Sequence, residues 1–499
     1  MIKLIYRIES DYMSKKRMLI VTSVILSVVT ISLGIVKLYQ TYALSNYIGT
    51  ETDTGIDVYI NDDSYVSIPA NGSSNVYYIL TNTNPGTVKY GVAYQTTSGV
   101  TVKVYDTSED PATGTIEENG KKYIKLRLEN SNSTNKTIEL STVLGYENGG
   151  DLVVPSGVTL VTDTYTPPPA AAEYITKLYT NASKTTVTNN SITYNTAPSV
   201  SLMNDRLGGT TTSLDGGNIR YYGANPNNYI YFNCSDYNNQ SSSTCETWRI
   251  IGVFNGKLKI IRNESIGRYS WDNKNTSTGA ESANGKNDWT TARLMKLLNP
   301  SDYYTTDSND NGLGQSLYYN NASGKCYSGQ NNATTNCDFT STGIKNDATR
   351  KLISEETWNI GGWNSSSIYS NQIYGYERGT TVYTDRPTTW TGKIALAYPS
   401  DYGYAADLSQ CTKTLNNYDN STCTSNNWMK AIIAPNYGWL LTPYSGRSNN
   451  AWSVYSPGGV NYDYVYYARG VAPVLYLSTK SIIESGSDGT SSNPYKLSA

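Results

Sequence analysis

The sequence predicts a multi-domain chain with one N-terminal transmembrane helix, an all-β domain and then an α+β domain. Three observations predict this order. An uncharged apolar segment lies near the N-terminus, short alternating segments fill residues 50–163, and all six cysteines lie between Cys234 and Cys423. The length of 499 residues is enough for two or three domains of ordinary size.

The membrane anchor is predicted from residues 18–36, which carry no charge. At about 1.5 Å per residue they would span ~28 Å, close to the hydrocarbon core of a bilayer. The basic residues 15–17 precede this segment, and after Lys37 no Lys or Arg occurs before Lys89. This asymmetry predicts a single-pass cell-membrane protein with a cytoplasmic N-terminus and an extracellular bulk.

We therefore assign residues 1–17 to the cytoplasm and residues 18–37 to the anchor. The alternative is a cleaved signal peptide, since Thr41-Tyr42-Ala43 is an acceptable cleavage site. Both interpretations export the rest of the chain.

Residues 50–163 are predicted to form a β-sandwich stalk domain of the immunoglobulin-like type. About seven alternating segments, separated by turn-rich clusters such as Glu118-Asn119-Gly120, are typical of such a sandwich. The expected strands are 56–60, 76–80, 88–94, 100–105, 123–128, 137–144 and 158–161.

The remaining chain is divided by composition. Residues 164–199 contain a Pro/Ala run and a Thr/Asn stretch and are predicted to be a linker, with a short helix at 173–179. Residues 200–483 form the cysteine-containing domain, and the Ser/Gly-rich residues 484–499 are expected to be a flexible tail.

The cysteine-containing domain mixes strands with short helices. Residues 248–254 and 257–262 flank Asn255-Gly256, the signature of a hairpin with a type I′ turn. Asp288 is a candidate cap for a helix through Leu298. Further helices are expected at 347–355 and 427–433.

The cysteines fall into three pairs, each separated by ten or eleven intervening residues. This clustering favours three local disulfides, although six cysteines allow 15 connectivities. A zinc site would prefer shorter spacings. Disulfides imply an oxidising compartment, in agreement with export. The pairs are Cys234 and Cys245, Cys326 and Cys337, and Cys411 and Cys423.

Composition excludes several function classes. The sequence has no histidine, which excludes Ser-His-Asp triads, Cys-His dyads and histidine metal sites. The net charge of -2 gives no basic excess for nucleic acid. We expect no enzyme activity, no metal and no cofactor. The 46 tyrosines, against 3 phenylalanines, suit both β-strands and an adhesive surface.

A family resemblance rests on several motifs in the last domain. They are Trp248-Arg249-Ile250-Ile251-Gly252-Val253, Asn287-Asp288-Trp289, residues 392–396 with 398–403, Gly438-Trp439-Leu440-Leu441-Thr442-Pro443 and Gly470-Val471-Ala472-Pro473-Val474-Leu475-Tyr476-Leu477. Residues 200–480 resemble an uncharacterised family of bacterial exported domains, similar in turn to the C-type-lectin-like and formylglycine-generating-enzyme-like fold.

That resemblance implies an α+β C-type-lectin-like head, but not the chemistry of the formylglycine-generating branch. That chemistry needs reactive cysteines, and here all six are assigned to pairs. Relatives usually carry Arg where this chain has Ala472. Fold alone does not fix function.

The candidate ligand-binding surface lies in residues 444–469. Two expected strands flank the turn 456–459, and the mix of Tyr, Asn, Ser and Asp is typical of binding surfaces. Lectin-like domains carry ligand loops here, some diversified by retroelements that mutate adenines. The alternative is an ordinary tyrosine-rich hairpin packed on the domain. The candidates are Tyr444, Arg447, Asn449, Asn450, Trp452, Tyr455, Asn461, Tyr462, Asp463, Tyr464, Tyr466 and Tyr467.

These observations predict a bacterial surface protein whose head binds an extracellular protein or carbohydrate. Two alternatives stay open. An exported enzyme could act on cell-wall or glycan material through carboxylates such as Asp401, Asp463 or Glu377, and a structural envelope protein could pack its head against neighbours.

Overall fold

The computed structural model describes residues 44–52, 55–59, 65–83, 85–145, 152–167, 169–205, 217–272, 284–305, 313–327 and 335–498, with the backbone alone described for 44–59 and 145. The predicted cytoplasmic segment and anchor, 1–37, lie outside these residues. Within the described residues, no helix is long and apolar enough to cross a membrane. The chain divides into unit 1, which ends at Pro167, and unit 2, which begins at Pro168.

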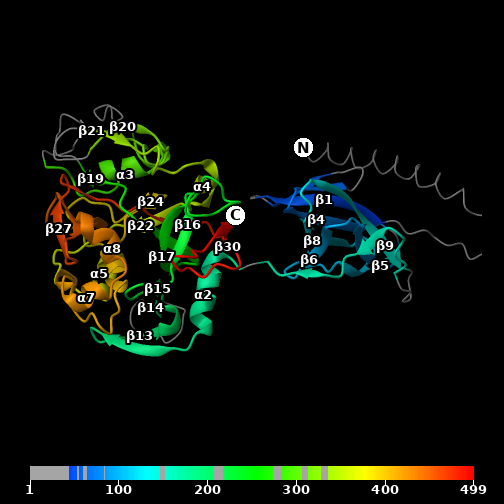
Figure 1. Ribbon diagram of the computed structural model, residues 1–499, viewed down its shortest axis with the longest axis horizontal. Helices are drawn as coiled ribbons and strands as arrows, with labels where there is room; N and C mark the ends of the chain where they lie inside the picture. The colour runs from blue at the N-terminus through cyan, green and yellow to red at the C-terminus, as the bar shows by residue number, and fades with distance from the viewer. Residues whose placement is uncertain are drawn as a thin grey trace, which may run out of the picture. The chain divides into compact units, whose positions relative to one another are not determined.

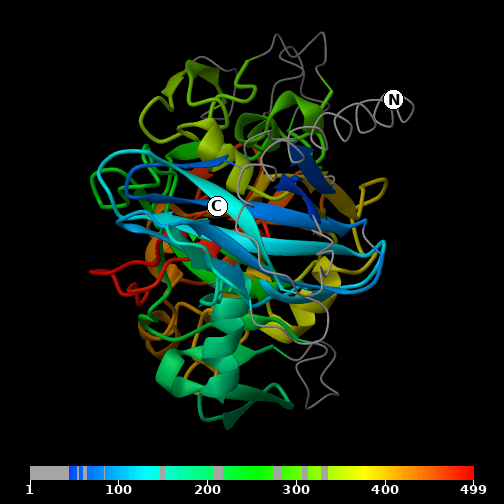
Figure 2. The same cartoon turned by 90° about the vertical axis from the view of Figure 1, so that its right-hand side faces the viewer.

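Unit 1 is built from two sheets (Figures 1 and 2, blue to cyan). The first is six-stranded, in the order β11-β6-β8-β4-β1-β2, and only the β11–β6 pair is parallel. Its strands are β1 (Leu44–Thr52), β2 (Gly55–Tyr59), β4 (Gly72–Asn82), β6 (Val100–Tyr105), β8 (Lys121–Asn130) and β11 (Thr164–Tyr165).

The second sheet of unit 1 is five-stranded and antiparallel, in the order β10-β5-β9-β3, with β7 also paired to β5. Its strands are β3 (Tyr65–Ile68), β5 (Val88–Gln95), β7 (Thr113–Ile116), β9 (Lys136–Gly145) and β10 (Val158–Leu160).

The two sheets share one apolar core. On β8, every second residue from Ile124 to Leu128 is fully buried, as strand alternation requires, and these side chains form one cluster with Tyr90 and Val92 of β5 and Leu140 of β9. The predicted β-rich character of residues 50–163 is confirmed, and each of the seven expected segments overlaps a strand. The alternation did not reveal β1, β3, β7 or β11.

Unit 2 is organised around a nine-stranded sheet, in the order β12-β13-β14-β15-β17-β18-β29-β24, with β16 also paired to β17 (Figure 1). Its strands are β12 (Thr185–Asn189), β13 (Ile192–Ala197), β14 (Leu202–Asn204), β15 (Ile219–Tyr221), β16 (Tyr229–Phe232), β17 (Glu246–Phe254), β18 (Lys257–Arg262), β24 (Ile394–Ala395) and β29 (Val474–Tyr476).

The β17–β18 hairpin confirms the predicted turn. Asn255 and Gly256 both have positive φ, 49° and 73°, as a type I′ turn requires. Gly252 lies where the backbone of β15 approaches closely, since an added Cβ would come within 2.1 Å of the Ile219 carbonyl oxygen. The turn of this hairpin is therefore set by local sequence, whereas Gly252 is required by the approach of another strand.

Smaller sheets surround the large one. A three-stranded sheet contains β25 (Trp439–Pro443), β26 (Asn450–Val454) and β27 (Val460–Tyr464). Two-stranded sheets pair β19 (Arg268–Ser270) with β28 (Ala468–Gly470), β20 (Ser323–Cys326) with β21 (Thr335–Asp338), β22 (Glu356–Asn359) with β23 (Thr389–Gly392), and β30 (Ile482–Ile483) with β31 (Leu497–Ser498).

The helices of the described residues are short. They are α2 (Ala171–Asn181), α3 (Arg293–Leu298), α4 (Asp347–Leu352), α5 (Ser370–Glu377), α6 (Pro399–Tyr404), α7 (Ser421–Ser425) and α8 (Lys430–Ile433). The expected helices at 173–179, 347–355 and 427–433 correspond to α2, α4 and α8. The expected cap of α3 is wrong, because Ala292 precedes the helix while the Asp288 carboxylate accepts from the Thr290 amide instead.

Three local disulfides confirm the predicted pairing, Cys234–Cys245, Cys326–Cys337 and Cys411–Cys423. Each closes a short loop within unit 2.

Two expected boundaries differ from the structure. The predicted linker 164–199 is largely folded, because α2 buries Ile175 and Tyr179 and β12–β13 extend the large sheet. The predicted flexible tail 484–499 is also packed against unit 2 as far as residue 498. Tyr495 and Leu497 are buried. The Gln240 side chain donates a hydrogen bond to the Leu497 carbonyl and accepts one from the Leu497 amide.

Candidate functional site

The candidate ligand-binding residues lie on and beside the β25–β26–β27 sheet. The predicted hairpin is present, with Trp452 opposite Tyr462 and Asn450 opposite Tyr464. β27 lies at an outer edge of unit 2 (Figure 1). The chain then continues through Tyr466 and Tyr467 into β28, so the sequence-predicted residues are brought together around one hairpin.

Four of the predicted residues have buried side chains. Trp452 is fully buried, and Asn450, Asp463 and Tyr444 are 2%, 6% and 8% exposed. Trp452 lies in the main apolar cluster of unit 2, on a strand whose residues are all buried. The indole packs in the apolar core and stabilises the sheet. Because it is fully buried, a ligand at the surface would not contact it.

The exposed part consists mainly of tyrosines. Arg447 and Asn461 are exposed, and the side chains of Asn449, Tyr455, Tyr462, Tyr464, Tyr466 and Tyr467 are half-buried. Tyr464 stacks on Tyr466, with ring centroids 5.3 Å apart, and Tyr467 meets both rings edge-on. We call Tyr462, Tyr464, Tyr466 and Tyr467 the tyrosine surface.

An ion pair that the sequence did not reveal fixes this surface. The Arg469 guanidinium donates to the Asp463 carboxylate, with 2.7 Å between Nε and Oδ2, and lies 5.3 Å from the Tyr467 ring centroid. It also lies 5.2 Å from the ring of Tyr437, which packs edge-on against Tyr455. Asp463 is therefore a structural carboxylate that holds the strand after the hairpin.

The loop between β25 and β26 is held by an asparagine from another part of the chain. The Asn287 amide donates to the carbonyl oxygens of Tyr444, Arg447 and Asn450, at 2.9, 2.8 and 3.0 Å. The Arg386 guanidinium donates to the Asn287 side-chain oxygen at 3.1 Å and to the Ser448 carbonyl at 3.2 Å. Asn287 belongs to one of the motifs of the family resemblance, but nothing in the sequence around it indicates that it binds the 444–450 loop.

Three phenols of this region have a raised pKa. Burial raises the pKa of Tyr455 to about 12, and the nearby Asp463 carboxylate acts in the same direction. Burial also raises the pKa of Tyr444 and of Tyr466. The surface offers aromatic rings and hydroxyl groups, with Arg447 as an exposed cation beside them.

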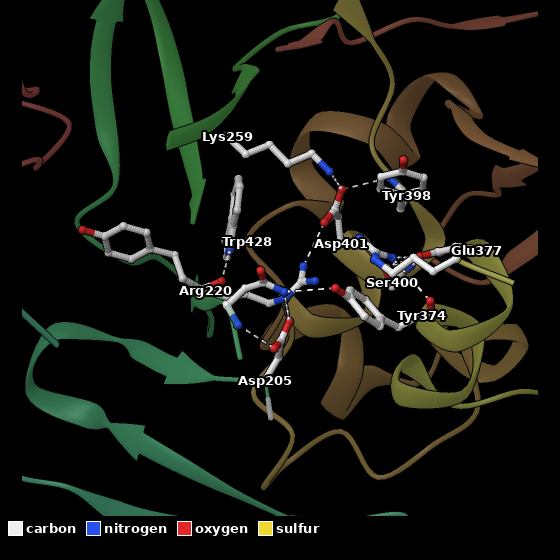
Figure 3. A network of polar contacts seen from close by, with 12 residues as sticks. Asp205, Arg220, Lys259, Tyr374, Glu377, Tyr398, Ser400, Asp401 and Trp428 are labelled. Atoms are coloured by element: carbon white, nitrogen blue, oxygen red, sulfur yellow. Dashed lines mark hydrogen bonds and ion pairs between the residues drawn. The ribbon is translucent and has the colours of Figure 1, made fainter. Parts of the chain in front are cut away.

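A second polar cluster lies inside unit 2 and contains two of the carboxylates considered for catalysis (Figure 3). Asp401 of α6 is fully buried between two cations. Its Oδ1 accepts from Arg220 at 2.8 Å, and its Oδ2 contacts the Lys259 ammonium. Arg220 also donates to Asp205, with 2.5 Å between Nε and Oδ2. Arg220 and Lys259 are two cations and Asp205 and Asp401 are two carboxylates, so the formal charge of these four residues is balanced.

Glu377 lies at the end of α5, and its carboxylate is fully buried. It accepts from the Ser400 amide at 2.9 Å and from the Ser400 hydroxyl at 2.5 Å, and Arg378 lies 3.1 Å away. Burial raises the pKa of Glu377 to about 7. Asp401 and Glu377 are thus occupied by protein partners, which fits structural roles better than the work of a glycosidase pair.

Within the residues that the structure describes, no group of three or more acidic or cysteine side chains is arranged to hold a metal ion.

The chain matches no protein-family model and no curated protein sequence.

Proposed function

We propose that this chain is a membrane-anchored bacterial surface protein whose C-terminal unit binds a protein or glycan ligand through the tyrosine surface. In this proposal the N-terminal helix anchors the chain, unit 1 is an immunoglobulin-like stalk, and unit 2 is a C-type-lectin-like head. The observation that carries the proposal is the clustering of half-buried tyrosines on and directly after one hairpin, above a buried scaffold.

Tyrosine suits such a role for physical reasons. The ring supplies a large apolar contact and a hydroxyl, and only two side-chain torsions lose freedom on binding. The ring stacking of Tyr464 on Tyr466 and the Arg469–Asp463 pair hold the surface in place before a ligand arrives. Preorganisation of this kind increases affinity because little ordering remains to be done.

Two further observations support the export and fold parts of the proposal. Three disulfides favour an oxidising compartment. The motif residues of the family resemblance occupy structural positions. Trp439–Pro443 form β25, and Val474–Tyr476 form β29, which lies between β18 and β24 in the large sheet. Asp401 and Glu377 lack the open setting that the enzyme alternative needs.

The binding proposal is tested on the full chain displayed on cells. Tyr464, Tyr466 and Tyr467 are changed together to Ser, and binding is measured on a printed glycan array and by adhesion to fluorescent bacterial cells. We expect a loss of roughly tenfold or more in apparent affinity, the size expected for a central aromatic cluster. The matched control changes Tyr65 and Tyr123, exposed tyrosines of unit 1, to Ser.

Binding that survives the triple change at full strength would remove the assigned surface. The same cells test localisation: protease added outside intact cells should digest units 1 and 2. Full protection of both units would contradict an extracellular head.

A further inference from the structure

The buried cluster of unit 2 contains a lysine and an aspartate in direct contact. Lys259 lies in the middle of β18 and Asp401 at the start of α6, 142 residues further along the chain. Both side chains are 0% exposed, and the Lys259 Nζ atom contacts Oδ2 of Asp401. The amine and the carboxyl group are thus held together in the interior of unit 2, and Figure 3 shows the two side chains pointing toward each other.

Aromatic rings enclose the amine. The Nζ atom lies 4.3 Å from the ring centroid of Tyr398, 5.1 Å from that of Phe254 and 5.5 Å from that of Trp358, and Tyr476 lies beyond at 5.6 Å. Such surroundings cannot hydrate an ammonium ion. Burial accordingly lowers the pKa of Lys259 to about 8, against the opposing influence of Asp401. The neutral, nucleophilic form of the amine is therefore more accessible here than on the surface.

The carboxyl group of Asp401 is fixed in position. Its Oδ2 accepts from the Tyr398 amide at 3.0 Å, and its Oδ1 accepts from Arg220 Nη1 at 2.8 Å. Arg220 itself cannot move away easily, because Asp205 holds the other side of its guanidinium. A cation at Oδ1 stabilises the negative charge that would develop on this oxygen if an amine attacked Cγ.

We propose that Lys259 and Asp401 condense to a covalent amide that joins β18 to α6. Against the effect of burial, Lys259 and Arg220 hold the pKa of Asp401 below its usual range, so the ion pair is the resting state. The reaction begins when Nζ passes a proton to Oδ2. The neutral amine then attacks Cγ, and the C–Oδ2 bond breaks. Oδ2 leaves with the transferred proton and a second proton from Nζ, as one water molecule. Nζ keeps its third hydrogen as the amide N–H, so no oxidant or other reactant is needed.

The charge balance of the cluster favours this product. Before the reaction, two cations and two carboxylates lie in the interior, and buried ions carry a large desolvation penalty. Afterwards the Lys259–Asp401 pair is neutral, while Arg220 keeps Asp205 as its partner. The new amide carbonyl, formerly Oδ1, can still accept from Arg220.

A neighbouring pair provides an internal comparison. Lys257 lies two residues before Lys259 on the same strand and pairs with Glu356, but the two side chains are 27% and 19% exposed. Water can solvate this amine and its carboxylate, so the ion pair is the stable state. We therefore expect no condensation between Lys257 and Glu356.

The test is a tryptic map of the full chain after reduction and alkylation of the cysteines. An unmodified Lys259 is a cleavage site, whereas an acylated one is not. The expected product is peptide 258–262 joined to peptide 394–413, with the summed mass of both less one water. Recovery of 394–413 as a linear peptide in more than half of the molecules would overturn the proposal.

Two variants separate the amide from the ion pair. Lys259→Arg keeps a cation beside Asp401 but cannot form the amide, so peptide 394–413 should appear only in its linear form. Lys257→Arg is the matched control and should leave the joined peptide unchanged. The test does not require either variant to fold, because the masses of the tryptic peptides from the natural chain show by themselves whether the amide is present.

Discussion

Tyr444 and Tyr462 stack face to face, with ring centroids 3.8 Å apart and planes inclined by 25°. Tyr444 follows β25, and its hydroxyl donates to the Asn364 carbonyl at 2.8 Å, whereas Tyr462 lies on β27. The stack therefore links the loop before β26 to the strand after it.

Replacement of Tyr462 by Ala should loosen that loop. We expect the free energy of unfolding of unit 2 to fall by roughly 1 kcal/mol, a size typical of an aromatic pair beyond simple burial. Chemical denaturation with tryptophan fluorescence measures the change. Tyr462→Phe keeps the ring and should stay close to the natural protein, and equal losses in both variants would show that the stack contributes nothing.

Arg220→Met should be among the most damaging single changes in unit 2. It leaves the buried Asp205 without its ion-pair partner and removes the donor to Oδ1 of Asp401. Breaking a buried pair by removing one member costs about 3–5 kcal/mol. Denaturant unfolding provides the measurement. The exposed i,i+4 pair of Lys177 and Glu173 is the comparison, and Lys177→Met should change stability by less than roughly 0.5 kcal/mol.

Stability should depend on pH through Glu377. Its pKa is about 7 in the folded protein, against the ordinary value of 4.5 expected in the unfolded chain. The folded protein therefore binds this proton more tightly. The stabilisation is complete below pH 4.5 and is lost as the pH rises to about 7, with an upper limit of about 3 kcal/mol.

Glu377→Gln should remove this dependence, because a neutral amide can still accept from the Ser400 amide. Unfolding temperatures measured between pH 4 and pH 8 give the comparison. If the natural protein and the variant keep parallel pH profiles, Glu377 does not titrate in this range.

The Cys411–Cys423 disulfide should be important for the hairpin region. Both cysteines are fully buried, and the closed loop contains the short 3-10 helix 415–417, which lies beside β27. Closing a loop of this size stabilises a fold by about 3 kcal/mol. The double change to Ser should lower the free energy of unfolding by about that amount. A loss within error of zero would mean that packing alone holds the loop.

Local sequence predicted the parts of the fold that local physics determines. The expected strand 100–105 is β6, Val100–Tyr105, because its apolar residues alternate toward one sheet face. Asn255-Gly256 forms the expected turn because both residues adopt positive φ. The three disulfides were predictable because each closes a short loop.

The rest depends on contacts between distant residues. Arg220 and Asp401 are 181 residues apart, and no spacing rule links them. Trp452 could have been a ligand-stacking residue or a core residue, and only the packed sheet shows that it is core. The Ser and Gly content of the tail predicts a loose segment, but the burial of two apolar side chains, Tyr495 and Leu497, holds it against the rest of unit 2.

The two ends of unit 2 are neighbours in space. Ala170 bridges Ile482, and Ile482 in turn pairs with Ser498, so the segment that leaves unit 1 runs beside the last described residues (Figure 1). A unit with adjoining ends can be spliced into a host loop or circularly permuted with a short peptide bridge. Unit 2 could therefore be moved between carrier proteins as a single insert, without disturbing the sheet inside it.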